Sequence, residues 1–510
     1  MKAAALCVSI ASIVYPSTTL AQSAAKVIER HIEAIGGKQA VEQIASTDLS
    51  GSITSADGRS GTFTLRSKRP QFFSVSLSWA DFRWRAGFNG RAAWQDDGLD
   101  GVRTLYGQAA SRVRAEARYA NTRLMIPEKI SRVQVTGRDQ LRGHAAIVLS
   151  TITPDGITRT LFFDAKTYLL LKDEQETDAG VEERFFDDYR RVDRVMEPHR
   201  IEWHRNGETL RLGVERVTHN APVDDHVFDI PVSSEPPLGI EALLSAAEGN
   251  EQKAEGVRTS YAYRQAMTVG WIDKQARVKQ NEGPTFDVFH LDGRPVARVI
   301  KNRGQPLSEA QQRREDERVN TIVREYERRR QSGQAGFPGS SRPAEFGVSL
   351  TLHSLWGGLV LRVPVMTSGW FPAYRRMSEF SNIRRERVRG RAVVVLEFRP
   401  KRDVMPNGDV ERQASKMAGA LWIDQASQQM IRIDSYFFDD YGSIVEGSSV
   451  WMEQTLVNDE VWLPSRAETN VRRSLGFGAL AQSLVVVQFT DHKKFTVETD
   501  STIALPTPAR

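Results

Sequence analysis

The sequence predicts a mainly β fold with helices, of the α+β class, in which one structural unit occurs twice. An Arg-Gly turn followed by an apolar run stands at residues 141–149 (LRGHAAIVL) and again at residues 388–396 (VRGRAVVVL). Apolar residues before an aspartate follow each of them, at 161–164 (LFFD) and 421–424 (LWID). In both halves a helical pattern comes first and alternating strand patterns follow. Such self-similarity indicates a repeated architecture.

A third landmark keeps the same order, since residues 195–198 (VMEP) match residues 461–464 (VWLP). The spacing between matched segments increases along the chain, as expected when the second copy has longer loops. The letters FFDDY also occur twice, at 185–189 and 437–441, but their spacing breaks the increasing order. We therefore predict that the two FFDDY segments lie on non-equivalent strands.

The first residues predict an export signal. Lys2 supplies the positive start, and residues 3–14 form an apolar stretch too short to span a bilayer. We expect residues 1–21 to be a signal peptide cleaved near Ala21, and the mature protein to be periplasmic. Because the single cysteine, Cys7, lies within this segment, we expect neither a disulfide nor a thiolate metal site in the mature chain.

Composition is that of soluble globular protein, with 40% hydrophobic and 26% charged residues among 510. This length is enough for roughly two to four domains. The net charge of +5 is small for the length and argues against a dedicated nucleic-acid binder. It is compatible with weak peripheral contact with an anionic membrane surface.

Helices are predicted at the start of each half. Residues 23–35 place Val27 and Ile32 on one face, and Gly36 ends this helix. A short helix over residues 38–44 follows before the strands begin. In the first half, residues 107–119 read as a third helix; the second half opens with a helix over residues 240–247.

Residues 73–79 and 82–88 predict an antiparallel hairpin, because apolar and polar side chains alternate along both. Asn89-Gly90, a dipeptide typical of tight turns, follows. These side chains are either ordinary core or the lining of a groove that holds an acyl chain. The large apolar residues on the inner face are Phe73, Val75, Leu77, Trp79, Phe82, Trp84 and Phe88.

A Ser- and Pro-rich segment at residues 232–238 marks the boundary between the halves. In the second half, a charged segment begins at Ser308 with a capping-box spelling and ends at Arg330, which predicts an inserted helix. The resulting domains are a first domain at 22–232, a linker and leading helix at 233–257, and a second domain at 258–510 with a helical insertion at 306–331 and a flexible loop at 332–345.

No catalytic constellation is present: the sequence has no phosphate-binding Gly loop, no dinucleotide fingerprint and no nucleophile elbow. The cluster that most resembles a metal site is His219, Asp224, Asp225 and His226. Residues 222–225 read more simply as a turn into the last strand of the first copy. We therefore expect no enzyme, no metal and no cofactor.

Several strand and turn motifs resemble those of a known family. They are AIGG at 34–37, GFNGRAAW at 87–94, FFD at 162–164 with YLLL at 168–171, and in the second copy LWID at 421–424, IRI at 431–433 and NDEVWLP at 458–464. Through them the sequence resembles the periplasmic lipoprotein-carrier superfamily, the LolA-like and outer-membrane lipoprotein-sorting proteins, here in two tandem copies.

The resemblance implies two tandem unclosed antiparallel β-barrels, each covered by helices, with the charged helical insertion in the second. In this family the concave apolar face holds acyl chains. The implied lining comprises the seven hairpin residues named above together with Trp422, Tyr436 and Phe438. A typical carrier has a single domain of roughly half this length, so this chain departs from the family pattern in its second copy and its insertion.

Two functions are consistent with these observations. The first is a soluble exported protein that binds lipids or lipoproteins and shelters their acyl chains, in lipoprotein or lipid sorting to the outer membrane. The alternative is a periplasmic protein–protein adaptor or envelope-stress sensor on the same fold, which docks envelope proteins through the helix between Ser308 and Arg330. Neither function involves nucleic acid.

Overall fold

The computed structural model describes residues 23–98, 101–122, 132–177, 180–205, 207–231, 239–272, 278–332, 348–349, 364–365, 370–476 and 479–494. Three predicted segments lie outside this set: the signal peptide, the boundary at 232–238 and nearly all of the loop at 332–345. Among the described residues, no helix combines the length and the apolar character needed to cross a membrane.

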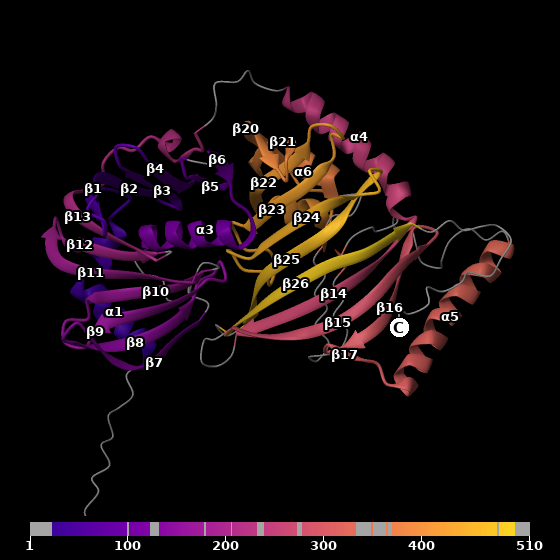
Figure 1. Cartoon of the computed structure of the whole chain (residues 1–510), viewed down its shortest axis with the longest axis horizontal. Helices are drawn as coiled ribbons and strands as arrows, with labels where there is room; N and C mark the ends of the chain where they lie inside the picture. The colour runs from indigo at the N-terminus through magenta and orange to yellow at the C-terminus, as the bar shows by residue number, and fades with distance from the viewer. Residues whose placement is uncertain are drawn as a thin grey trace, which may run out of the picture.

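The chain is mostly antiparallel β structure with some helices, arranged in two large sheets that are not closed (Figure 1). The first sheet has the order β6-β5-β4-β3-β2-β1-β13-β12-β11-β10-β9-β8-β7, and the second has the order β17-β16-β15-β14-β26-β25-β24-β23-β22-β21-β20. A separate pair joins β18 (Val348–Ser349) and β19 (Pro364–Val365).

The strands of the first sheet are β1 (Ser46–Ser55), β2 (Ser60–Lys68), β3 (Phe72–Ser78), β4 (Arg83–Phe88), β5 (Ala93–Asp96), β6 (Val102–Thr104), β7 (Arg132–Leu141), β8 (His144–Ile152), β9 (Thr158–Asp164), β10 (Leu170–Thr177), β11 (Gly180–Val192), β12 (Val195–Arg205) and β13 (Glu208–His219). Those of the second are β14 (Tyr261–Ile272), β15 (Val278–Leu291), β16 (Arg294–Asn302), β17 (Gln305–Pro306), β20 (Ser378–Val388), β21 (Arg391–Pro400), β22 (Met417–Asp424), β23 (Met430–Phe437), β24 (Ser449–Val457), β25 (Val461–Gly476) and β26 (Ala479–Lys494).

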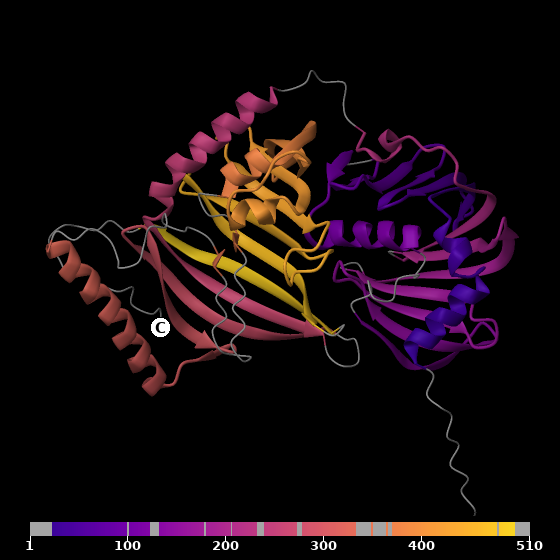
Figure 2. The ribbon, with the colours of Figure 1, turned by 180° about the vertical axis from the view of Figure 1, so that it is seen from behind.

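The helices are α1 (Ala24–Ala34), α2 (Lys38–Glu42), α3 (Gly107–Thr122), α4 (Ile240–Arg258), α5 (Glu309–Gln331), α6 (Trp370–Met377) and α7 (Asp409–Ala414), with a 3-10 turn, η2 (Asp225–Phe228). α3 and α4 are longer than the sequence pattern predicted, and α6 and α7 were not predicted. Figure 2 shows α4 along the strands of the second sheet and α5 at its far edge.

The repeated landmarks occupy equivalent places in the two sheets. Counted from the β7 edge and the β20 edge, the Arg-Gly turns precede the second strands, the LFFD and LWID segments end the third, and VMEP and VWLP open the sixth. The turn residues Arg142 and Arg389 share a φ of 50°, and each is followed by a glycine with positive φ, as in a tight hairpin turn. The FFDDY segments lie on β11 and at the end of β23, which are not equivalent, as predicted.

The two sheets contact each other through α3. The Asp434 carboxylate on β23 accepts hydrogen bonds from the Gly107 backbone N–H at 2.8 Å and from Arg114 at 2.9 Å, and all three residues are buried. Farther along α3, Arg118 pairs with Asp155 at 3.3 Å and with Glu446 at 3.0 Å. α3 is therefore enclosed between the first sheet and the second.

Candidate functional site: a cavity beside α3

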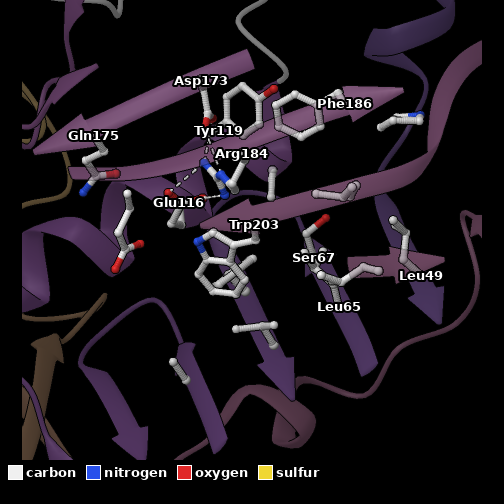
Figure 3. Close-up of a pocket in the computed structure, with 18 of the residues that line it drawn as sticks. Leu49, Leu65, Ser67, Glu116, Tyr119, Asp173, Gln175, Arg184, Phe186 and Trp203 are labelled. Atoms are coloured by element: carbon white, nitrogen blue, oxygen red, sulfur yellow. Dashed lines mark hydrogen bonds and ion pairs between the residues drawn. The ribbon is translucent and has the colours of Figure 1, made fainter. Parts of the chain in front are cut away.

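A cavity of about 510 Å³ lies between α3 and the inner face of the first sheet (Figure 3). Strands β1–β5 contribute one side of its lining and strands β10–β13 the other, while α1 reaches one end. The volume falls within the roughly 300–1,000 Å³ of sites that bind a single small molecule.

One wall of the cavity is apolar. Cross-strand pairs Leu49↔Leu65 and Leu65↔Val75 join β1, β2 and β3, so these side chains share the inner face. The apolar lining of the two sides comprises Leu49, Phe63, Leu65, Phe73, Val75, Ala86, Phe186, Met196, Ile201 and Leu212. Apart from Thr47, Ser67, Trp84 and Gln95, the lining side chains of β1–β5 offer no hydrogen-bonding groups, which suits a hydrocarbon chain.

The opposite wall carries paired charges. Arg184 on β11 donates to Asp173 at 2.7 Å and to Glu116 of α3 at 2.9 Å (Figure 3). Arg159 on β9 contacts the same two carboxylates, at 3.8 Å for Asp173. Two guanidinium groups thus share two carboxylates, and the wall is polar but close to neutral.

Burial governs the protonation of this wall. Burial lowers the pKa of Arg159 to about 10, and the neighbouring Arg184 adds to the shift. Burial also acts to lower the pKa of Arg184, but the Asp173 carboxylate outweighs it and the pKa is raised. Both guanidinium groups therefore carry their charge at neutral pH, which keeps the four-residue pairing intact.

α1 forms one end of the cavity through His31 and Ile35. The His31 ring packs against Phe163, with 5.0 Å between ring centroids, and its Nδ1–H donates to the Tyr168 carbonyl at 2.9 Å. Burial lowers the pKa of His31 to about 4, so the ring is neutral at physiological pH. The side chains that line this end from His31 and Ile35 are therefore buried and uncharged.

Aromatic side chains stand at the other end, where β4 begins and β12 ends. The rings of Trp84 and Trp203 meet edge to face with centroids 6.3 Å apart, and both line the cavity. The guanidinium of Arg205 lies over both rings, at 4.6 Å from Trp84 and 4.5 Å from Trp203. All three are partly exposed, so this end is the mouth of the cavity.

The hairpin residues predicted as lining are distributed between the cavity and its surroundings. Phe73, Val75 and Trp84 line the cavity. Leu77 and Phe88 are buried on the same inner face, paired with Trp84 and Phe73 respectively. Trp79 and Phe82 lie outside the cavity lining at the hairpin turn, where their rings contact each other at 5.9 Å.

The three lining residues predicted in the second copy do not lie in this cavity. Trp422 is buried at the junction of the two sheets, where its ring contacts Tyr106 at 6.0 Å. Tyr436 packs against Phe88 at 5.8 Å, and its hydroxyl donates to the Gly90 carbonyl at 2.7 Å. Phe438 follows β23 and is partly exposed. Trp422 and Tyr436 therefore hold the two sheets together.

The residues that resembled a metal cluster have other partners. His219 hydrogen-bonds to Asp193 at 3.2 Å and to Glu197 at 2.8 Å, whereas His226 contacts Asp229 at 3.0 Å in the η2 turn. Across the described chain, no group of three or more His, Cys, Asp and Glu side chains is placed to hold a metal ion.

Pattern reasoning missed the charged wall. In β11 the cavity-facing residues are Glu182, Arg184 and Phe186, which alternate with Glu183 and Phe185. Charged residues on both faces of a strand are typical of an exposed edge, so the alternation of residue types along β11 gave no sign that one face is buried. A usable signal was the balance of opposite charges, because Glu116 of α3 carries a carboxylate that can pair with the arginines of β9 and β11.

Comparisons with known proteins give matches only among solved structures. No protein-family model matches the chain, and no curated protein does. A LolA superfamily protein from Nitrosomonas europaea is 16% identical, over 41% of this chain and 97% of its own, with a TM-score of 0.29. A DUF1329 family protein from Desulfovibrio piger is 11% identical, over 40% and 97%, with a TM-score of 0.29.

The complex of MucA and MucB from Pseudomonas aeruginosa is 11% identical, over 91% of this chain and 93% of the matched chain, with a TM-score of 0.19. Similarities this low give no information about a ligand. The matched solved structures include a LolA superfamily protein, a member of the superfamily that the sequence motifs resemble.

Proposed function

We propose that this protein binds the acyl chain of a lipid or a lipidated protein in the cavity beside α3, as part of lipid or lipoprotein sorting in the periplasm. The observation that carries the proposal is a cavity of about 510 Å³ with one mostly apolar wall. A hydrocarbon chain gains about 0.8 kcal/mol for each CH₂ group removed from water. A partly inserted chain therefore binds with useful affinity, and no catalytic residue is needed.

The proposal includes the architecture that serves this function. The first and second domains, 22–232 and 258–510, are two tandem copies of one unclosed barrel with helices on the inner face. Only the first copy is assigned the acyl chain. In the second, one continuous hydrophobic cluster from α4, α6 and the sheet includes Leu244, Tyr374 and Leu421, and these residues are buried.

The first test is mass spectrometry of organic extracts from the protein purified gently from a periplasm. A stoichiometric lipid or acylated peptide is the expected result. If the protein is empty and remains empty after incubation with envelope lipids, the proposal is wrong.

A matched pair of variants locates the lipid. Val75→Glu introduces a carboxylate into the apolar wall, whereas Ser76→Glu places the same group on the outer face of the same strand. We expect lipid content to fall at least tenfold in Val75→Glu and to stay unchanged in Ser76→Glu, with both variants folded by circular dichroism. Equal lipid content in the two variants would contradict the cavity assignment.

A second candidate function, a protein–protein adaptor, is favoured by α5. This helix attaches to the sheet through a hydrophobic cluster around Val319 and a few polar contacts with β16, and it leaves most of its charged side chains exposed. Reversing the exposed charges at Arg324 and Arg328 tests it in a pull-down of envelope proteins. An unchanged set of captured proteins would argue against a docking role for α5.

A further inference from the structure

The strongest unexplained feature of the cavity is the cation at its mouth. Arg205 ends β12, and its guanidinium lies over the indole rings of Trp84 and Trp203 at 4.6 and 4.5 Å. Stacking against two aromatic rings fixes the plane of a guanidinium and leaves its N–H groups at the edges free to donate. The position of this cation is therefore set before any ligand arrives.

Arg205 differs in its partners from Arg184, which lines the cavity, and from Arg159, which contacts the same carboxylates as Arg184. Arg159 and Arg184 are each paired with carboxylates of the charged wall. Within the described chain no hydrogen bond or ion pair joins Arg205, although burial lowers its pKa and Glu182 and Glu208 act on it electrostatically. A partly desolvated guanidinium without a hydrogen-bonded anion loses part of its hydration with little in return.

The length of the cavity agrees with a tail that starts at this cation. Along β12 the lining runs from Met196 to Trp203, which spans roughly 23 Å at the rise of an extended strand. One acyl chain spans roughly 15 Å, half the hydrocarbon thickness of a bilayer. A chain that begins near Trp203 therefore ends before the end formed by α1.

We propose that Arg205 binds the anionic head of a single-chain amphiphile, a carboxylate or a phosphate, whose tail lies along the apolar wall. This inference rests on the proposed function and specifies the class of ligand. Planar guanidinium groups bind both anions through two parallel N–H···O bonds. Glu182 also lines the mouth, and its negative charge weakens the binding of the head.

The test compares three ligands of one chain length, dodecanoate, dodecyl phosphate and dodecanol, titrated into the purified full chain by calorimetry. We expect both anions, or the one that matches the natural head, to bind at least tenfold more tightly than the alcohol. Arg205→Gln should weaken the binding of that anion by about ten- to a hundredfold and leave the affinity for dodecanol unchanged. Arg205→Lys should keep part of the preference, because the charge remains, and Glu182→Gln should tighten anion binding.

Arg200→Gln is the matched control, since Arg200 lies on the same strand, is exposed and pairs with Asp187 on the outer surface. It should change none of the three affinities. Equal affinity of the wild-type protein for the anions and for dodecanol would overturn the headgroup assignment while leaving acyl binding intact. The headgroup assignment would also be overturned if Arg205→Gln lowered the affinity for dodecanol as much as the affinity for the anion. Failure of all three ligands to bind would overturn the proposed function as well.

Discussion

Arg184 and Arg200 lie on neighbouring strands of the first sheet but in opposite environments. Arg184 faces the cavity and pairs with Asp173 and Glu116, whereas Arg200 pairs with Asp187 on the outer surface, where both side chains are mostly exposed. A buried charge that loses its partner is costly, and an exposed pair contributes little. At the scale of single residues, burial decides what an ion pair contributes.

We expect Arg184→Met to lower the free energy of unfolding by about 3–5 kcal/mol, because it leaves two carboxylates with Arg159 alone. Arg200→Met should cost less than about 1 kcal/mol. Urea unfolding of both variants, followed by circular dichroism, measures the difference. Similar losses in the two variants would show that the charged wall is as accessible to water as the outer surface.

His31 predicts a dependence of stability on pH. Burial lowers its pKa from 6.5 to about 4 in the folded protein. The unfolded chain therefore takes up a proton below pH 6.5 that the folded chain resists, and stability falls as the pH decreases toward 4. Between pH 7 and pH 5 this group alone should remove about 2 kcal/mol.

His31→Gln keeps a hydrogen-bond donor but does not titrate. The difference in unfolding free energy between pH 7 and pH 5 should thus be about 2 kcal/mol smaller in this variant than in the wild type, measured by urea unfolding at both values. An identical pH dependence would mean that His31 is hydrated in the folded state.

Residue patterns predicted some of the cavity and missed the rest for physical reasons. The alternation of apolar and hydroxyl side chains identified the β3 face that carries Phe73 and Val75. The family resemblance implied Trp422 and Tyr436 as lining residues, but sequence does not say what covers a large aromatic side chain. Here the first sheet covers them.

Sequence signals located elements well where local chemistry sets their ends. The capping box at Ser308 and Gln311 is present, and α5 starts directly after it. α4 was predicted to end at Ala247 but continues to Arg258 through Gly249, because its later turns are held by tertiary contacts such as those of Ala254. Propensity is weak compared with packing.

The apolar runs of β21 and β22 indicate strands that are covered on both faces. Val393–Leu396 in β21 are four consecutive buried residues, and every residue of β22 is buried. Strands with this pattern are covered on both faces. One face meets the cluster of α4 and α6, and the other meets Ala92 and Tyr106 of the first sheet.

α5 should unfold locally without the rest of its sheet. Its attachment combines one cluster, in which Val319 is fully buried against Phe289 and Val296, with polar contacts to β16 such as that of Glu315 with the Val299 backbone N–H at 2.8 Å. Val319→Asp buries an unpaired carboxylate there and should release the helix. Hydrogen–deuterium exchange of peptides from 309–331 should become fast in this variant, while peptides from β25 stay protected. Asn320→Asp, on the exposed neighbour, should leave exchange unchanged.

The arrangement of the whole molecule is set by the junction between its two sheets. The repeat predicted two units of like topology, and the strand orders correspond. It could not predict how the units pack, because that depends on features that differ between the copies, such as Arg114 of α3 and Asp434 of β23. Those two residues form a buried ion pair across the junction at 2.9 Å.

The Arg114–Asp434 pair predicts that the stability of the junction depends on pH. Burial raises the pKa of Asp434 despite the opposing effect of Arg114. Arg114→Met removes the opposing charge, so the variant should lose about 3–5 kcal/mol at pH 8 and the two sheets should unfold in separate transitions. A carboxyl with a raised pKa stabilises the fold most when protonated, and this stability is lost as pH rises through the folded pKa. The loss should therefore be smaller at pH 5 than at pH 8, as measured by urea unfolding with intrinsic fluorescence.

The double variant Arg114→Met with Asp434→Leu should recover most of the stability, because it leaves no unpaired charge at the junction. A single unfolding transition in Arg114→Met, with a loss that is independent of pH, would show instead that the remaining contacts of the junction, such as those of Trp422 and Tyr436, are sufficient to join the sheets.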